Sequence, residues 1–129
     1  MPQPIRVLLI DDEPDFLETV SYWLTSQGYQ VALATTGTDA LTHIARQAPD
    51  VIFLDIVMPR MDGLATLKRL RASNVMTPVV LLTTTGQNPS ELIEFQALGI
   101  AGVFQKQASL DVFHQVLESA LKSRGPSSL

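Results

Sequence analysis

Short apolar runs alternate with amphipathic segments along almost the whole chain. The runs consist almost entirely of apolar residues, as expected for strands that are buried on both faces of a sheet. The run at 30–35 is the most polar of them, which favours a place near a sheet edge for that strand. We expect strands at residues 5–10, 30–35, 51–54, 79–82 and 102–105.

The segments between these runs repeat apolar residues at helical spacing, which predicts five helices. The apolar side of the first helix comprises Phe16, Val20, Trp23, Leu24 and Gln27. The expected N-caps of later helices are Thr38, Asn88 with Pro89 at the next position, and Ser109. The expected helix ends lie at Gly28, Pro49 and Gly99, and a turn at 59–63 precedes the third helix.

A strict alternation of strand and helix predicts a parallel sheet with helices on both of its faces. We therefore expect an α/β fold, namely a flavodoxin-like doubly wound sheet of five parallel strands with five helices. Such sheets bind ligands outside the carboxyl ends of their strands, near the point where the strand order reverses. If the strand order is 2-1-3-4-5, the second strand lies at an edge and the other four strands border one crevice.

Polar residues follow four of the five expected strands at these carboxyl ends. They are Asp11, Asp12 and Glu13 after the first strand, Asp55 after the third, Thr83 to Thr85 after the fourth and Lys106 after the fifth. Carboxylates that lie close together repel one another unless a cation compensates. An all-oxygen site of this type suits Mg²⁺, beside which a carboxylate can attack phosphorus and form an acyl phosphate. Lys106 and a strand-end hydroxyl could then neutralise the phosphoryl oxygens.

Composition narrows the classes of function. Thirteen Asp and Glu against nine Lys and Arg give a net charge of −4, which argues against direct contact with nucleic acid. The absence of cysteine excludes disulfides, thiol catalysis and zinc–thiolate sites. We find no signal-peptide pattern and no apolar run near the roughly 20 residues that span a bilayer, so we expect no membrane contact and a cytoplasmic location. We expect one domain over residues 1–124 and a tail or linker stub over 125–129.

Four segments together resemble the receiver domain of two-component response regulators, in particular that of chemotaxis regulators. The segments are LLIDDEP at 8–14, LDIVMPRMDG at 54–63, PVVLLTT at 78–84 and GVFQK at 102–106. Each signal is modest by itself, but their joint order and spacing are highly specific. The resemblance extends from about Arg6 to Lys122 and so includes nearly the whole chain.

This resemblance implies a phosphorelay role in which a histidine kinase or a histidine phosphotransfer protein donates a phosphoryl group to an aspartate. The implied site residues are Asp55 as acceptor, Thr83 and Lys106 as partners of the phosphoryl group, and Asp11, Asp12, Asp55 and the Val57 backbone carbonyl as ligands of Mg²⁺, with Asp11 acting through water. Thr84 is the alternative to Thr83. The chain would not be an enzyme beyond Mg²⁺-dependent self-phosphorylation and self-dephosphorylation.

The resemblance also implies how the signal leaves the domain. Phosphorylation would shift the region of the fourth and fifth strands, and a downstream protein or effector domain would detect the shift at the last two helices. A homodimer is compatible with this scheme. Direct contact of this domain with nucleic acid is not part of it.

Simpler interpretations exist for several residues. Asp11 to Glu13 are also typical of a cluster that caps a helix and complements its dipole. A single lysine such as Lys106 is most often a solvated surface residue. His43 and His114 lie in helical segments away from the strand ends, and we interpret them as structural or surface residues. Trp23 lies on the apolar side of the first helix, and we interpret it as a core residue rather than part of a binding surface. Asp62 is more typical of a turn-stabilising residue than of a chemical one.

Three other functions remain open alternatives. A degenerate receiver could act as a constitutive interaction module without phosphorylation. A metal-dependent phosphohydrolase could use Asp55, but Val57 then occupies the place of its general acid. A flavin-binding protein would need a phosphate-binding loop rich in Ser, Thr and Gly after the first strand, and the sequence has none there.

Two positions depart from the family pattern. Val103 stands where the family commonly has Tyr or Phe, and Phe104 should point to the other face of its strand. Gln107 follows Lys106 where the family usually has a proline. A cis bond is costly before a residue other than proline, so we expect a trans bond and a shifted loop there.

Overall fold

Five parallel strands form one sheet in the computed structural model, which describes residues 3–56, 63–84 and 89–123. The strands are β1 (Arg6–Ile10), β2 (Gln30–Ala34), β3 (Val51–Asp55), β4 (Val79–Thr83) and β5 (Gly102–Gln105). Their order is β2-β1-β3-β4-β5, so the expected strand order and the edge position of the second strand are both confirmed. Every observed strand lies within one residue at each end of its predicted range.

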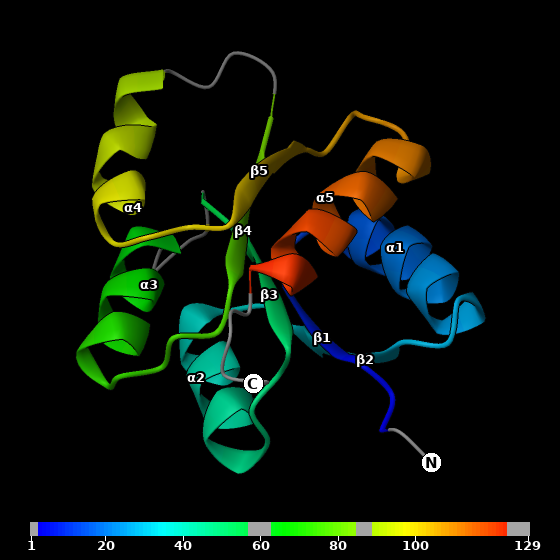
Figure 1. Ribbon diagram of the computed structural model, residues 1–129, viewed down its shortest axis with the longest axis horizontal. Helices are drawn as coiled ribbons and strands as arrows, with labels where there is room; N and C mark the ends of the chain where they lie inside the picture. Colours follow the sequence, from blue (N-terminus) through cyan, green and yellow to red (C-terminus); the bar gives the residue numbers. More distant parts are fainter. Residues whose placement is uncertain (1–2, 57–62, 85–88, 124–129) are drawn as a thin grey trace.

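Helices cover both faces of this sheet. They are α1 (Pro14–Ser26), α2 (Gly37–Arg46), α3 (Gly63–Ala72), α4 (Ile93–Ala97) and α5 (Leu110–Lys122), and a 3₁₀ turn, η1 (Pro89–Leu92), leads into α4. Figure 1 shows α1 and α5 together on one face and α2, α3 and α4 on the other. Each face has its own hydrophobic core, and the shared strands separate the two cores. The flavodoxin-like α/β fold is thereby confirmed.

The N-cap of α2 differs from the predicted one. The hydroxyl of Thr36, and not that of Thr38, accepts a 3.0 Å hydrogen bond from the backbone N–H of Asp39. Thr36 has the extended backbone of a cap, whereas Thr38 lies inside the helix, where its carbonyl accepts from the Thr42 hydroxyl. Both threonines suit a cap by composition, and only the position of the preceding strand decides between them.

Other predicted helix ends agree with the structure where it describes them. The Ser109 hydroxyl caps α5 by accepting from the N–H of Val112 at 3.2 Å. Gly28 and Gly99 follow the ends of α1 and α4 with φ of 93° and 85°, a backbone conformation that favours glycine. Asn88 and the turn residues 59–62 lie outside the described residues, so their predicted roles stay predictions.

The buried side of α1 is shifted from the predicted one. Its fully buried residues are Leu17, Val20 and Leu24, whereas Gln27 is exposed and does not belong to the apolar side. Trp23 is half-buried and meets the ring of Phe113 edge-on, with 6.0 Å between the ring centroids. Among the described residues, no helix has the length and apolar character needed to cross a membrane.

Candidate functional site

The parallel register brings the carboxyl ends of the central strands to one level. Ile10 pairs with Leu54 at the ends of β1 and β3, so Asp11 and Asp55 emerge side by side. Carboxylate oxygens of Asp11, Asp12 and Asp55 all lie within 4.8 Å of one another. Asp11 is fully buried, Asp55 is 6% exposed and Asp12 is open to solvent. The structure therefore joins the three aspartates that the strand ends predicted.

Asp11 combines two tasks. Its Oδ1 accepts a 2.8 Å hydrogen bond from the N–H of Glu13, the N-cap residue of α1, but no described side chain makes a capping hydrogen bond to this helix, so the predicted cap is not observed. Its Oδ2 is buried, and its partner among the described residues is the Lys106 ammonium, 2.8 Å away. A buried carboxylate is costly unless a cation compensates its charge.

Lys106 reaches into this cluster from the end of β5. Its side chain is only 6% exposed, and its ammonium pairs with Asp11 at 2.8 Å, with Asp55 at 3.9 Å and with Glu13. The ammonium also lies 5.0 Å from the centre of the Phe16 ring. The interpretation of Lys106 as a solvated surface lysine is therefore wrong.

The groups around Lys106 shift the pKa of its ammonium. Burial lowers the pKa of the Lys106 ammonium, but the hydrogen bonds with Asp11 and Glu13 and the charges of Asp11 and Asp55 together outweigh burial. The pKa of Lys106 is therefore raised above its ordinary value. At neutral pH the ammonium is a permanent cation inside the acidic cluster.

The last residue of β4 is Thr83, which is 4% exposed, whereas Thr84 follows the strand and is open to solvent. The Thr83 carbonyl accepts a 2.8 Å hydrogen bond from the backbone N–H of Lys106. This bond fixes the end of β4 against the residue that follows β5. Val57 and Thr85 lie outside the described residues, so the predicted metal ligand at the Val57 carbonyl stays a prediction.

Two features of the site were not predicted from the sequence. One is the ion pair of Glu13 with Lys106, which joins residues 93 positions apart. The other is the close approach of Gly63 to β3, where a Cβ atom at residue 63 would lie 2.5 Å from the Asp55 carbonyl oxygen. A glycine directly after an aspartate at the start of a predicted helix is a signal that could have revealed the second feature.

The donor set fits a divalent cation with a preference for oxygen. Three carboxylates, those of Asp11, Glu13 and Asp55, pair with the Lys106 ammonium, and the Asp12 carboxylate adds a fourth negative charge next to Asp11 and Asp55. Asp11, Asp12 and Asp55 offer oxygen atoms within 4.8 Å of one another, a distance suited to one ion. Oxygen ligands and a partly open position match Mg²⁺, which keeps several of its waters.

The strand β5 shows how the departures from the family pattern are accommodated. Val103 is 38% exposed, whereas Phe104 is 2% exposed and meets the Phe113 ring edge-on with 5.0 Å between the centroids. The predicted opposite orientation of these two side chains is confirmed. No cis peptide occurs in the described residues, so the predicted trans bond between Lys106 and Gln107 is confirmed as well.

The two histidines lie away from the acidic cluster, as expected. His43 is on α2, with its Nε2 atom 4.0 Å from a carboxylate oxygen of Asp39. His114 is on α5, where its ring meets Trp23 with 5.7 Å between the centroids. Neither histidine has an ion pair or ring contact with the strand-end residues in the described part of the chain.

Known proteins with the same pattern are response regulators. The model of the response regulator receiver domain family matches residues 7–118. The probable transcriptional regulatory protein TcrX of Mycobacterium tuberculosis is 44% identical over 81 residues, which make up 63% of this chain and 35% of TcrX. The transcriptional regulatory protein GlrR of Escherichia coli is 29% identical over 126 residues, which make up 98% of this chain and 28% of GlrR.

Solved structures agree with the sequence relatives. The chemotaxis protein CheY4 of Vibrio cholerae superposes with a TM-score of 0.85 at 30% identity, over 92% of this chain and 99% of CheY4. The chain spans only about a third of the length of TcrX and GlrR, but it matches CheY4 over almost the entire length of both proteins.

Proposed function

The chain belongs to the response regulator receiver domain family of two-component systems, and we propose that it accepts a phosphoryl group from a phosphohistidine on Asp55. The observation that supports this most is the position of the Asp55 carboxylate. It is nearly buried at the end of β3, next to two aspartates that could share a metal ion and 3.9 Å from a lysine ammonium.

The proposed transfer forms one bond and breaks one bond. An oxygen lone pair of Asp55 attacks the phosphorus atom of the donor, and the P–N bond to the donor imidazole breaks. The imidazole nitrogen keeps the bonding pair and takes up a proton from solvent. Asp55 thereby becomes an acyl phosphate. Such a transfer depends mainly on positioning and on neutralising the phosphoryl oxygens.

The residues around Asp55 have separate roles in this proposal. Asp11, Asp12, Asp55 and the Val57 carbonyl would hold Mg²⁺, with Asp11 acting through water. When bound, Mg²⁺ would supply positive charge to the phosphoryl oxygens. Lys106 would leave Asp11 and pair with the phosphoryl group, and Thr83 would donate a hydrogen bond to it. In this proposal the chain accepts the phosphoryl group itself and does not catalyse a reaction of a second molecule. It would therefore act as a phosphorylation-dependent switch and not as an enzyme.

A histidine kinase or histidine phosphotransfer protein would be the donor, which implies a cytoplasmic reaction. A downstream protein or an effector domain would detect the change at α4, β5 and α5, and a homodimer could use the same side of the domain. We further propose residues 1–124 as the receiver domain and 125–129 as a tail or linker stub. Contact of this domain with nucleic acid or membrane is not part of the proposal.

Measurement of the intact protein mass distinguishes a receiver that is phosphorylated from a degenerate receiver that binds its partner constitutively. The protein is incubated with Mg²⁺ and a small acyl phosphate, and its mass is compared with that of Asp55→Asn. We expect the wild type to gain one phosphoryl group and the variant to gain none. A wild type that gains none, and that also fails to bind beryllofluoride, would support the alternative of a degenerate receiver that acts as an interaction module. The intact acidic cluster and the buried Lys106 argue against that alternative.

A further inference from the structure

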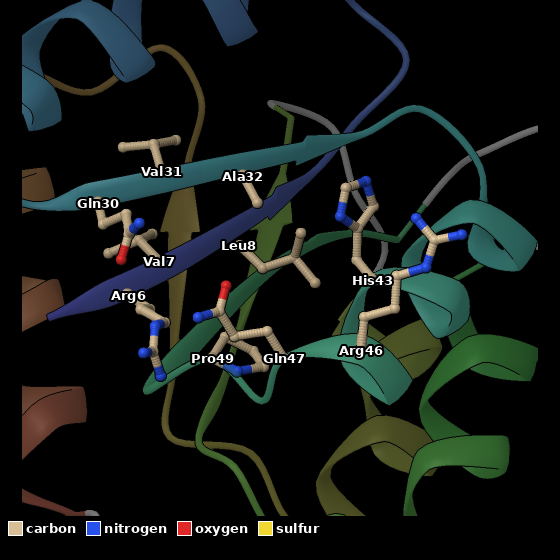
Figure 2. Close-up of a pocket in the computed structure, with 10 residues that line it drawn as sticks. All are labelled: Arg6, Val7, Leu8, Gln30, Val31, Ala32, His43, Arg46, Gln47 and Pro49. Carbon is tan, nitrogen blue, oxygen red and sulfur yellow. The ribbon is translucent and has the colours of Figure 1, made fainter.

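A hollow of about 230 Å³ lies between the last turn of α2 and the first residues of β1 and β2 (Figure 2). It occupies the amino-terminal halves of these strands and is therefore separate from the acidic cluster at their carboxyl ends. Its lining comprises Arg6, Val7, Leu8, Gln30, Val31, Ala32, His43, Arg46, Gln47 and Pro49. Leu8 and Ala32 belong to the core on the α2 side of the sheet and form an apolar floor.

The polar lining of the hollow is rich in N–H donors and has no carboxylate, although the two glutamine amides and the histidine ring also carry acceptor atoms. Two arginines, one histidine and two glutamines line it, and no Asp or Glu is among the lining residues of this part of the described chain. The whole chain has only nine Lys and Arg, two histidines and a net charge of −4. Two of these nine cationic side chains, Arg6 and Arg46, therefore line one hollow, while Asp39 lies next to His43 outside the lining.

The Arg6 guanidinium is held in place by a neighbour at the end of α2. With the Gln47 amide turned so that its oxygen faces Arg6, the orientation that satisfies both groups, this oxygen accepts hydrogen bonds from the Arg6 Nε and Nη2 atoms, both at 3.0 Å. Since Gln47 carries no charge, it orients the guanidinium without neutralising it. The remaining N–H groups of Arg6 are free to bind an anion.

Arg46 supplies the second cation. Its side chain is exposed and makes no hydrogen bond or ion pair with the described residues. In Figure 2, Arg46 and His43 lie toward one end of the hollow, and Arg6 and Gln30 lie toward the other. Basic residues in the last turn of a helix also complement its dipole, which would explain Arg46 and His43. That effect does not explain Arg6, which lies on a strand.

We propose that this hollow binds a small organic phosphate. A phosphate monoester presents several acceptor oxygens, which matches a lining with two guanidinium groups and no carboxylate, and arginine forks bind such oxygens in pairs. Its organic part would lie on the apolar floor of Leu8 and Ala32. The volume is below the roughly 300–1,000 Å³ of pockets for drug-sized ligands, so the ligand is small.

The test uses phenyl phosphate, inorganic phosphate and benzoate as probes in the full chain, at fixed ionic strength and without divalent cations. Excluding divalent cations prevents transfer to Asp55, so the result is independent of the proposed phosphorylation. Binding is followed by ¹H–¹⁵N correlation spectra. We expect saturable shifts at residues 30–32 and 43–47, with phenyl phosphate binding several-fold more tightly than inorganic phosphate or benzoate.

Two variants and one control locate the site. Arg46→Gln and Arg6→Gln should each weaken phenyl phosphate at least about tenfold, since each removes a charged donor. Arg69→Gln removes an arginine from a different hollow on α3 and should leave the affinity unchanged. The proposal is overturned if the shifts fail to saturate, if they occur around Lys106, if benzoate binds as tightly as phenyl phosphate, or if Arg46→Gln binds like the wild type.

Discussion

The guanidinium of Arg71 donates a 2.8 Å hydrogen bond to the carbonyl oxygen of Gly99, and so joins the last turn of α3 to the end of α4. The same guanidinium also donates to the carbonyls of Leu98, Val75 and Thr77, at 3.1, 2.7 and 3.2 Å. Burial lowers the pKa of Arg71, and four carbonyl partners compensate part of the lost hydration. One side chain thus joins three segments next to β4.

Replacing Arg71 by Met should therefore destabilise the protein. We expect a loss of about 2–3 kcal/mol in the free energy of unfolding, because the variant leaves carbonyl groups without their charged donor. Urea unfolding followed by circular dichroism measures the loss. Arg69→Met, an exposed arginine on the same helix, should change the free energy by less than about 0.5 kcal/mol. Equal effects of the two substitutions would contradict this prediction.

Gly63→Ala should damage both stability and the acidic site. Its Cβ would lie 2.5 Å from the Asp55 carbonyl oxygen and 2.8 Å from the Ile56 Cα, so the backbone that carries Asp55 must move. We expect a loss of about 2–3 kcal/mol together with slower phosphorylation of Asp55. Gly102→Ala is the matched control, since its Cβ would only touch Val116 at 3.5 Å. A Gly63→Ala protein as stable and as reactive as this control would refute the steric argument.

Lys106 should make the stability of the metal-free protein dependent on alkaline pH. Its pKa in the folded state is raised above the unfolded value of about 10.4, so its stabilising contribution is complete below that value. The contribution is lost as the pH rises through the folded pKa. Unfolding free energies of the wild type and Lys106→Met, measured between about pH 8 and pH 11.5, should therefore converge at the alkaline end. A difference in unfolding free energy that stays constant over this pH range would show that the charge of Lys106 does not contribute to stability.

Glu13→Gln should strengthen the binding of beryllofluoride, which mimics the phosphoryl group on Asp55. Glu13 pairs with the Lys106 ammonium, which lies 3.9 Å from the Oδ2 atom of Asp55. Without the carboxylate, less energy is needed to move Lys106 to a phosphoryl group. We expect beryllofluoride to bind about three- to tenfold more tightly, which corresponds to roughly 1 kcal/mol. Titration of Glu18→Gln, an exposed change on the same helix, provides the reference, and tighter binding there as well would point to general charge rather than to Lys106.

The fold was accessible from the sequence because its signals are local. Apolar runs, helical spacing and glycine positions predicted all five strands to within one residue at each end, whereas the strand order did not follow from them and was assumed. The errors occurred where two neighbours suit one role equally, as with Thr36 and Thr38, or where an amphipathic side can be assigned one residue off, as with Leu17 and Gln27.

Contacts between residues far apart in the sequence were harder to predict. The aspartates and Lys106 were expected to lie together, because parallel strands have their carboxyl ends at one edge of the sheet and these residues follow the strands there. No local pattern shows that Glu13 would reach Lys106, or that Arg71 would bind carbonyls 27 and 28 residues away. Such contacts depend on the loop paths and rotamers that the complete fold creates, and many sequences satisfy the same local pattern without them.

Trp23 gives the protein an optical reporter of its own. It is the only tryptophan in the chain, and its indole ring is in edge contact with Phe113 and His114 on α5. Its fluorescence therefore depends on how α1 packs against α5. A change in emission on metal binding or phosphorylation would show that the packing of α1 against α5 changes. Unchanged emission would limit the structural change to the face of the sheet that carries α4.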